Sequence, residues 1–156
     1  MVEPQQIYFL AAAVVVVSLT SIGFFLREAI AVSNSYQHGV TLYQQRDYVG
    51  AEFAFREVIS RHPSNDIAHL LLGDTLMQQD KLEEAIAEFR GLSRRAPKNV
   101  DVHLRLGTAL LQQDKLEEAI AALQQARDLF KAQRNTQKAD SVEQILQEIR
   151  TKHSLT

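Results

Sequence analysis

Apolar residues follow two different patterns along this chain of 156 residues. Residues 7–26 contain no charged side chain, and no polar face interrupts the run. A helix over this stretch spans about 30 Å at 1.5 Å per residue, which is the thickness of a bilayer's hydrocarbon core. Further along, apolar residues recur at helical spacing between polar ones, for example at Leu82, Ile86 and Phe89. The sequence therefore predicts one membrane-spanning helix followed by amphipathic helices.

The amphipathic part repeats itself with a step of 34 residues, since the segment 78–86 returns letter for letter at 112–120. Small and helix-ending residues keep the same step: Gly39, Gly73 and Gly107; Ala51, Ala85 and Ala119; Pro63 and Pro97. Small residues allow two antiparallel helices to approach closely, and Pro ends a helix. A period of this length is typical of a helix-turn-helix repeat, in which a neighbouring copy covers each exposed apolar face.

The second copy carries a recognisable motif at Leu72-Gly73, Leu76, Ala85, Phe89 and Pro97. This motif resembles the tetratricopeptide repeat. The first copy departs from it at His38, and the third has Lys131 where the closing Pro is expected. The resemblance covers about residues 32–133, in repeats at about 32–65, 66–99 and 100–133. It implies an all-α solenoid of three helix pairs.

Other segments flank the repeats. Residues 1–6 form a short polar tail before the span, and no Pro or Gly interrupts 27–38, so the span is expected to continue into the repeat domain of 27–133. Within 134–156 one more helix is predicted, with an apolar face made by Ala139, Val142, Ile145, Leu146 and Ile149. The predicted fold is therefore all-α: an N-terminal transmembrane helix, a three-repeat solenoid and a C-terminal capping helix.

A cleaved signal peptide is the alternative to the span. Ala29-Ile30-Ala31 imitates a cleavage site, but a signal peptide has a shorter apolar core and a positive N-terminal region, whereas the tail here has Glu3 and no Lys or Arg. Basic residues mark the cytoplasmic flank of a span, and Arg27 follows this one. We therefore expect a single-pass membrane protein with its repeats on the cytoplasmic or stromal side.

Composition and motifs argue against several kinds of function. The formal charge is -2, with 17 basic and 19 acidic residues well mixed, so no nucleic-acid surface is indicated. No Cys, phosphate-binding loop or nucleophile motif is present, and no enzyme, cofactor, metal or small-molecule substrate is predicted. His69 and His103 recur with the repeat, and we expect them to pack between paired helices, because no Cys and no converging carboxylate accompanies them.

The resemblance also implies a protein-binding groove, because the first helix of each tetratricopeptide repeat lines a concave surface at fixed positions. In this sequence those positions are Tyr36, Val40, Tyr43, Gln44, Leu70, Asp74, Met77, Gln78, Leu104, Thr108, Leu111 and Gln112. Aromatic and Met side chains suit peptide recognition. For Leu70 and Leu104, packing against the next repeat is an equal alternative. Basic and amide clamp residues of chaperone-binding members are replaced at Tyr36, Val40 and Asp74, so a receptor for chaperone tails is not expected.

The whole layout resembles the small membrane-anchored tetratricopeptide proteins of cyanobacteria and plastids that assist photosystem I assembly. The Gln-rich repeat style, as in Leu111-Gln112-Gln113 and Leu123-Gln124-Gln125, contributes to this resemblance. It implies a thylakoid scaffold that contacts photosystem I subunits or assembly intermediates. Two alternatives stay open: a bacterial inner-membrane repeat protein of envelope or cytochrome biogenesis, and a regulatory or anchoring subunit of a membrane enzyme complex.

Overall fold

The structure is a computed structural model that describes residues 4–153, with the side chains of 13–27 and 34–152. Within these residues it is entirely helical. The helices are α1 (Pro4–Gln44), α2 (Tyr48–Arg61), α3 (Asp66–Gln78), α4 (Leu82–Arg95), α5 (Val100–Gln112), α6 (Leu116–Ala132) and α7 (Thr136–His153). The all-α solenoid predicted from the repeats is thus confirmed.

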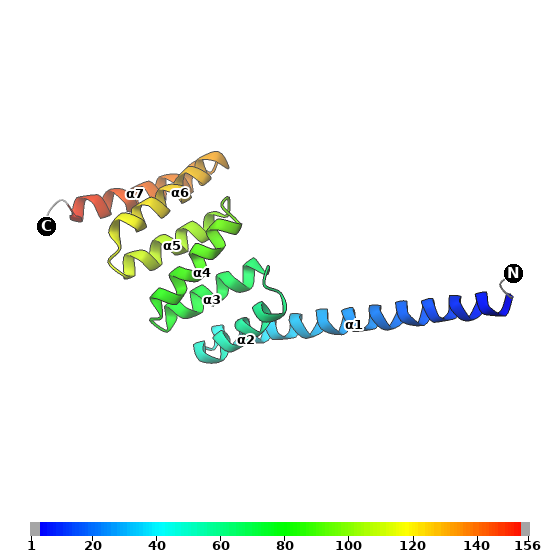
Figure 1. The fold of residues 1–156 in the computed structure, drawn as a ribbon. Coiled ribbons are helices and arrows are strands. Elements are labelled where there is room, and N and C mark those ends of the chain that lie inside the picture. The colour runs from blue at the N-terminus through cyan, green and yellow to red at the C-terminus, as the bar shows by residue number, and fades with distance from the viewer. Residues whose placement is uncertain (1–3, 154–156) are drawn as a thin grey trace.

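Successive helices form antiparallel pairs that stack side by side (Figure 1). The last turns of α1 pair with α2, α3 pairs with α4, and α5 pairs with α6. One apolar cluster, centred on Phe55, Leu72 and Phe89, runs through these pairs. A second cluster, with Phe130 and Leu146, joins α6 to α7, which lies on the open end of the stack.

Short connections with defined caps separate the helices. Asn65 accepts a hydrogen bond from the Ala68 N–H at 3.0 Å, and Asn99 accepts one from the Asp101 N–H at 3.1 Å. The helix α2 begins at Tyr48, directly after Asp47. The Asp47 carboxylate accepts from the Gly50 N–H at 3.0 Å, so Asp47 acts as the N-cap of α2, and the turn before it lies at residues 45–46.

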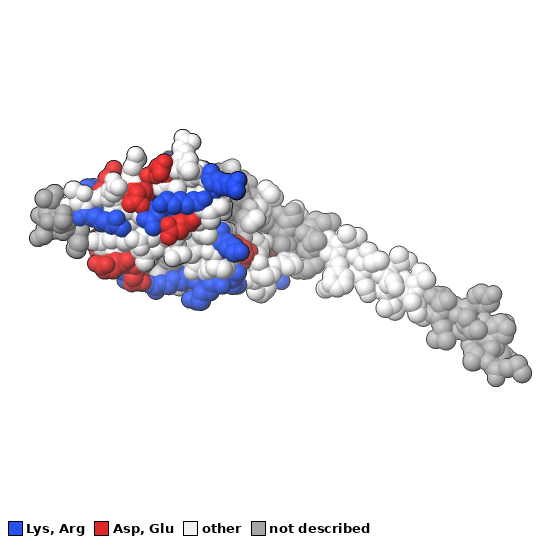
Figure 2. Space-filling view, turned by 90° about the horizontal axis from the view of Figure 1, so that it is seen from above, with Lys and Arg blue, Asp and Glu red and all other residues white. Residues whose placement is uncertain are grey.

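The helix α1 is continuous from the N-terminal segment into the first repeat, as the absence of Pro and Gly from 27–38 predicts. Its N-terminal part projects beyond the stack (Figure 1). Where the side chains of this part are described, the space-filling view shows no charged one on the visible face (Figure 2). The predicted span of 7–26 falls partly on residues 7–12, whose side chains lie outside those described. In the part of the chain that is described, no helix has the length and apolar character needed to cross a membrane, so the structure does not support this prediction.

Candidate protein-binding site

The first helix of each repeat contributes to one side of the stack. Here α3 contacts α5 directly, and α1 occupies the equivalent place in the first repeat. The predicted groove residues all lie on these three helices. Four of them are exposed: Gln44, Gln78, Thr108 and Gln112. The other eight are partly buried, so every one of the predicted residues retains some accessible surface.

The apolar members of this set also support the fold. The side chains that pack against the main core are Tyr36, Val40, Tyr43, Leu70, Met77 and Leu111. The Tyr36 ring lies 6.4 Å from that of Phe55, and Leu104 packs against the second cluster. For Leu70 and Leu104, therefore, the packing role is observed. The site presents partly buried apolar surface, bordered by exposed Gln44, Gln78 and Gln112 where the three helices end.

Three polar side chains, one from each repeat, gather on α1, α3 and α5: Tyr43, Asp74 and Arg105. Arg105 Nε lies 2.8 Å from both carboxylate oxygens of Asp74, so α5 is tied to α3 by a charged pair. Burial raises the pKa of Asp74, against the lowering effect of Arg105. Burial also raises the pKa of Tyr43, and the nearby Asp74 and Tyr48 raise it further. The phenol of Tyr43 thus lies within the electrostatic reach of the pair.

Asp74 was predicted as a groove residue, but its carboxylate is occupied by Arg105 rather than free for a ligand. Arg105 was not among the predicted site residues. The two are 31 residues apart, which is one helical turn less than the repeat of 34, and Tyr43 precedes Asp74 by the same step. A search of the sequence for oppositely charged residues 31 positions apart, which is the repeat length minus one helical turn, could have found this pair.

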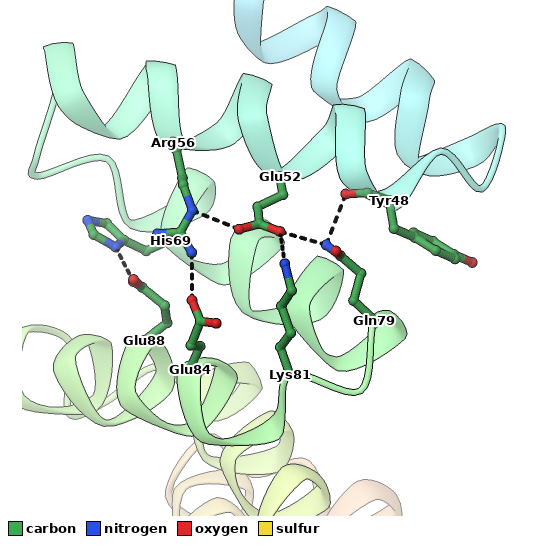
Figure 3. Close-up of polar contacts among 8 residues, drawn as sticks. All are labelled: Tyr48, Glu52, Arg56, His69, Gln79, Lys81, Glu84 and Glu88. Atoms are coloured by element: carbon green, nitrogen blue, oxygen red, sulfur yellow. Dashed lines mark hydrogen bonds and ion pairs between the residues drawn. The ribbon is translucent and has the colours of Figure 1, made fainter.

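A second polar network joins the first repeat to the second, on α2 and the start of α4 (Figure 3). The Glu52 carboxylate accepts hydrogen bonds from Gln79 Nε2 at 2.8 Å, Lys81 Nζ at 2.7 Å and Arg56 Nε at 2.9 Å. Arg56 also donates to Glu84 at 2.8 Å. Burial acts to raise the pKa of Glu52, but the hydrogen bonds from Lys81, Gln79 and Arg56 outweigh it and lower that pKa to about 2. These contacts hold two repeats together.

The two recurring histidines join each repeat to the loop before it. Nε2 of His69 lies 2.9 Å from the Pro63 carbonyl oxygen, and Nε2 of His103 lies 2.9 Å from that of Pro97. No converging carboxylate was predicted, yet Glu88 does reach Nδ1 of His69 at 2.7 Å (Figure 3). Across the described residues no group of three or more potential metal ligands forms, so these contacts read as structural.

In a comparison with protein families, the sequence matches a model described as a tetratricopeptide repeat over residues 36–100 and 72–134. Curated proteins compared with the chain yield no match. Several solved structures share the fold. The TPR2B domain of yeast Sti1, in its complex with pHsp70, is 20% identical with a TM-score of 0.71, and the match covers 79% of this chain and 98% of that one.

Two bacterial structures are similar to the same extent. The type III secretion chaperone SycD of Yersinia enterocolitica, in complex with a peptide of the translocator YopD, is 20% identical with a TM-score of 0.72, covering 79% of this chain and 95% of that one. PcrH from Pseudomonas aeruginosa, in complex with the chaperone binding region of PopD, is 17% identical with a TM-score of 0.73, covering 80% and 95%. At these identities the similarity establishes the fold alone.

Proposed function

Because the chain belongs to the tetratricopeptide repeat family, we propose that it is a scaffold that binds a client polypeptide on its α1, α3 and α5 face. The observation that carries this proposal is the partly buried apolar surface of Tyr43, Met77 and Leu111 with exposed Gln side chains beside it. Apolar anchors surrounded by a polar rim are the usual anatomy of a protein interface. The proposal requires no catalysis, cofactor or small-molecule substrate.

A peptide is the form of client that we favour. SycD and PcrH are described in complexes with a translocator peptide and a chaperone binding region, respectively. An extended or helical segment can place successive side chains on the three parallel helices of such a face. The Arg105–Asp74 pair is charge-balanced, so the centre of the face favours a client segment without a strong net charge there.

We further propose that residues 7–26 anchor the scaffold in a membrane as a single-pass helix, with the repeats on the cytoplasmic or stromal side. The uncharged sequence supports this, and so do the exposed apolar side chains along α1, among which Val14 is 65% and Phe25 70% exposed. Large exposed apolar surfaces are rare on proteins surrounded by water alone. Arg27 next to the span supports the orientation.

The client that we propose is a subunit or assembly intermediate of a membrane complex, photosystem I of the thylakoid membrane in particular. The layout of anchor, three repeats and cap, together with the Gln-rich repeats, supports this. Anchoring raises the effective concentration of the scaffold near a membrane client. Purification of the native complex in mild detergent followed by mass spectrometry tests it. Recovery of envelope-biogenesis proteins, or of one stoichiometric enzyme, in place of photosystem subunits would exclude the photosystem role.

Substitutions on the two faces test the groove. We expect Tyr43→Ala, and separately the exposed pair Gln78→Ala with Gln112→Ala, to weaken client capture by the full chain about tenfold or more, since central interface residues can each contribute about 2 kcal/mol. Phe53→Ala is the matched control, because Phe53 is 75% exposed and lies on α2, which is not one of the three helices of the proposed face. Capture is measured by quantitative mass spectrometry, with circular dichroism to verify helix content. Loss of capture in Phe53→Ala alone would move the site to the other face.

A further inference from the structure

One edge of the solenoid carries a cluster of exposed cations. This edge holds the ends of α2, α4 and α6 and the connections that follow them, and α1 projects from the same side (Figure 1). The name basic edge is used here for the exposed basic residues at the ends of α4 and α6, in the connections that follow them and in the first turn of α7. They are Arg94, Arg95, Lys98, Lys131, Arg134 and Lys138. In Figure 2 blue side chains are more frequent on the half of the solenoid nearer the projecting helix.

The acidic residues near this edge neutralise only part of its charge, at Arg95. The last turns of α2 and α6 and the first turns of α3, α5 and α7 contain Glu57, Asp66, Asp101, Asp128 and Asp140. The first four contact, in that order, Arg61, Arg95, Arg105 and Arg127. Arg94, Lys98 and Arg134 form no ion pair within the described residues, so the edge keeps an excess of positive charge.

Helix stability explains only part of this cluster. A cation in the last turn of a helix complements the macrodipole, which accounts for Arg94 and Arg95 on α4 and for Lys131 on α6. Lys98 and Arg134 lie in the connections, each after the end of one helix and before the start of the next, so the macrodipoles do not account for them. Lys138 lies in the first turn of α7, with its Nζ 5.5 Å from the centre of the Phe130 ring. Lys98 and Arg134 are therefore better explained by an external anionic partner than by the helices.

The direction of α1 indicates where that partner lies. From Leu26 to Ser35, whose hydroxyl donates to Glu57 at 3.2 Å, α1 continues for nine residues, or about 13 Å. A bilayer has roughly 6 Å of headgroup region outside each face of its hydrocarbon core. The solenoid edge that faces this way would then begin about 7 Å from the headgroups, which is within the Debye length of about 8 Å at physiological salt.

We propose that the basic edge binds the anionic headgroups of the membrane in which residues 7–26 are anchored, so that the solenoid leans on the lipid surface. This inference rests on the anchor proposed above. Clustered Lys and Arg close to a span are attracted by anionic lipids, and the attraction falls off within a Debye length. Contact at the edge would fix the orientation of the α1, α3 and α5 face relative to the bilayer, and would therefore determine the direction from which a membrane-bound client approaches.

The experiment places one fluorescent label at the edge of the full chain. The protein has no Cys, so Gln133→Cys, in the exposed connection between α6 and α7, gives a single labelling site. The labelled chain is reconstituted in vesicles of phosphatidylcholine alone, or of phosphatidylcholine with phosphatidylglycerol, each containing a headgroup-linked quencher. We expect quenching at least about twofold stronger in the anionic vesicles, and a loss of this difference at high salt.

Two matched variants test whether the basic edge causes the stronger quenching in anionic vesicles. Neutralising the basic edge by Arg94→Gln, Lys98→Gln and Arg134→Gln should reduce quenching to the value in phosphatidylcholine. The control removes the same charge from the opposite edge by Arg46→Gln, Lys115→Gln and Lys152→Gln. It should preserve the difference in quenching between the two kinds of vesicle. Equal quenching in both kinds of vesicle, or an equal fall in both variants, would overturn the proposal. Tighter edge-dependent binding to a short DNA duplex than to anionic vesicles would also overturn it, in favour of another polyanion.

Flotation separates this inference from the anchor. Phosphatidylcholine vesicles carry no net charge, so flotation of the chain with them reports on residues 7–26 alone. A chain that floats with these vesicles but shows no dependence on anionic lipid would keep the anchor and refute the basic edge. A chain that floats only with anionic vesicles, through the basic-edge residues, would keep the edge and refute the anchor.

Discussion

Glu52 occupies the position that Ile86 and Ile120 hold in the later repeats. The loop opposite it is copied unchanged, so Gln113 and Lys115 correspond to Gln79 and Lys81. Ile86 is buried and cannot accept hydrogen bonds. The first junction between repeats is therefore polar at this position, where the second is apolar.

The Glu52 network predicts a specific dependence of stability on pH. The pKa of Glu52 is about 2 in the folded chain against 4.5 for the free group, so its contribution is fully present above pH 4.5 and is lost as the pH falls from about 4.5 to about 2. We expect the difference in melting temperature between the natural chain and Glu52→Gln to shrink over that range. Glu117→Gln, at an exposed position, is the control and should show no such trend. A constant difference for Glu52→Gln down to pH 2 would contradict the lowered pKa.

At the scale of the elements, four connections share one turn geometry. A left-handed residue ends the helix, at Arg46, Asp80, Asp114 and Arg134, with φ between 55° and 63°. The N–H of the next residue then bonds to a carbonyl five residues back, as Lys81 does to Leu76 at 3.0 Å. This is the Schellman motif, in which Gly is usual. No Gly stands there, so the residue types do not reveal the turn. The connections that contain Pro63 and Pro97 have no left-handed residue and form a different kind of turn.

Close contact between paired helices depends on glycine. A Cβ built on Gly73 would lie 2.6 Å from Cζ of Phe89, and one on Gly107 would lie 2.7 Å from Cγ of Leu123. We expect Gly73→Ala to cost about 1–3 kcal/mol, because the ring must shift. Gly91→Ala is the matched control, since a Cβ there meets nothing within 4 Å, and it should stabilise α4 by about 0.5–1 kcal/mol. Thermal melting of both variants tests this. A higher melting temperature for Gly73→Ala would contradict the close approach of α3 and α4 at this glycine.

For the whole molecule, the stack needs a cover at its open end. The inner surface of α6 includes Leu123, Ala126 and Phe130, and α7 covers it with Ala139, Val142 and Leu146. Repeat arrays generally require a terminal element with a polar outer face. Here α7 provides one, because it carries its apolar residues on one side and charged or polar ones, such as Glu148, on the other.

Neighbouring residues of α7 test this role. Leu146 is fully buried, and we expect Leu146→Ala to cost about 2–5 kcal/mol through lost contacts and the cavity left behind. Ile145 is 43% exposed, so Ile145→Ala should change stability by less than about 1 kcal/mol. Chemical unfolding of the full chain measures both changes. Similar costs for the two variants would indicate that α7 does not pack on α6 through this face.

The sequence by itself determined the number of repeats, the pairing of helices and the register. Gly39, Gly73 and Gly107 recur at the points of closest approach, and a periodic pattern of small and large residues admits one way of burying its apolar face. The Tyr43, Asp74 and Arg105 cluster and the left-handed turns were decided only by the tertiary structure. Residues 31 positions apart face each other because of how one helix pair is rotated against the next, and that rotation arises from packing along the entire stack rather than from any local run of residues.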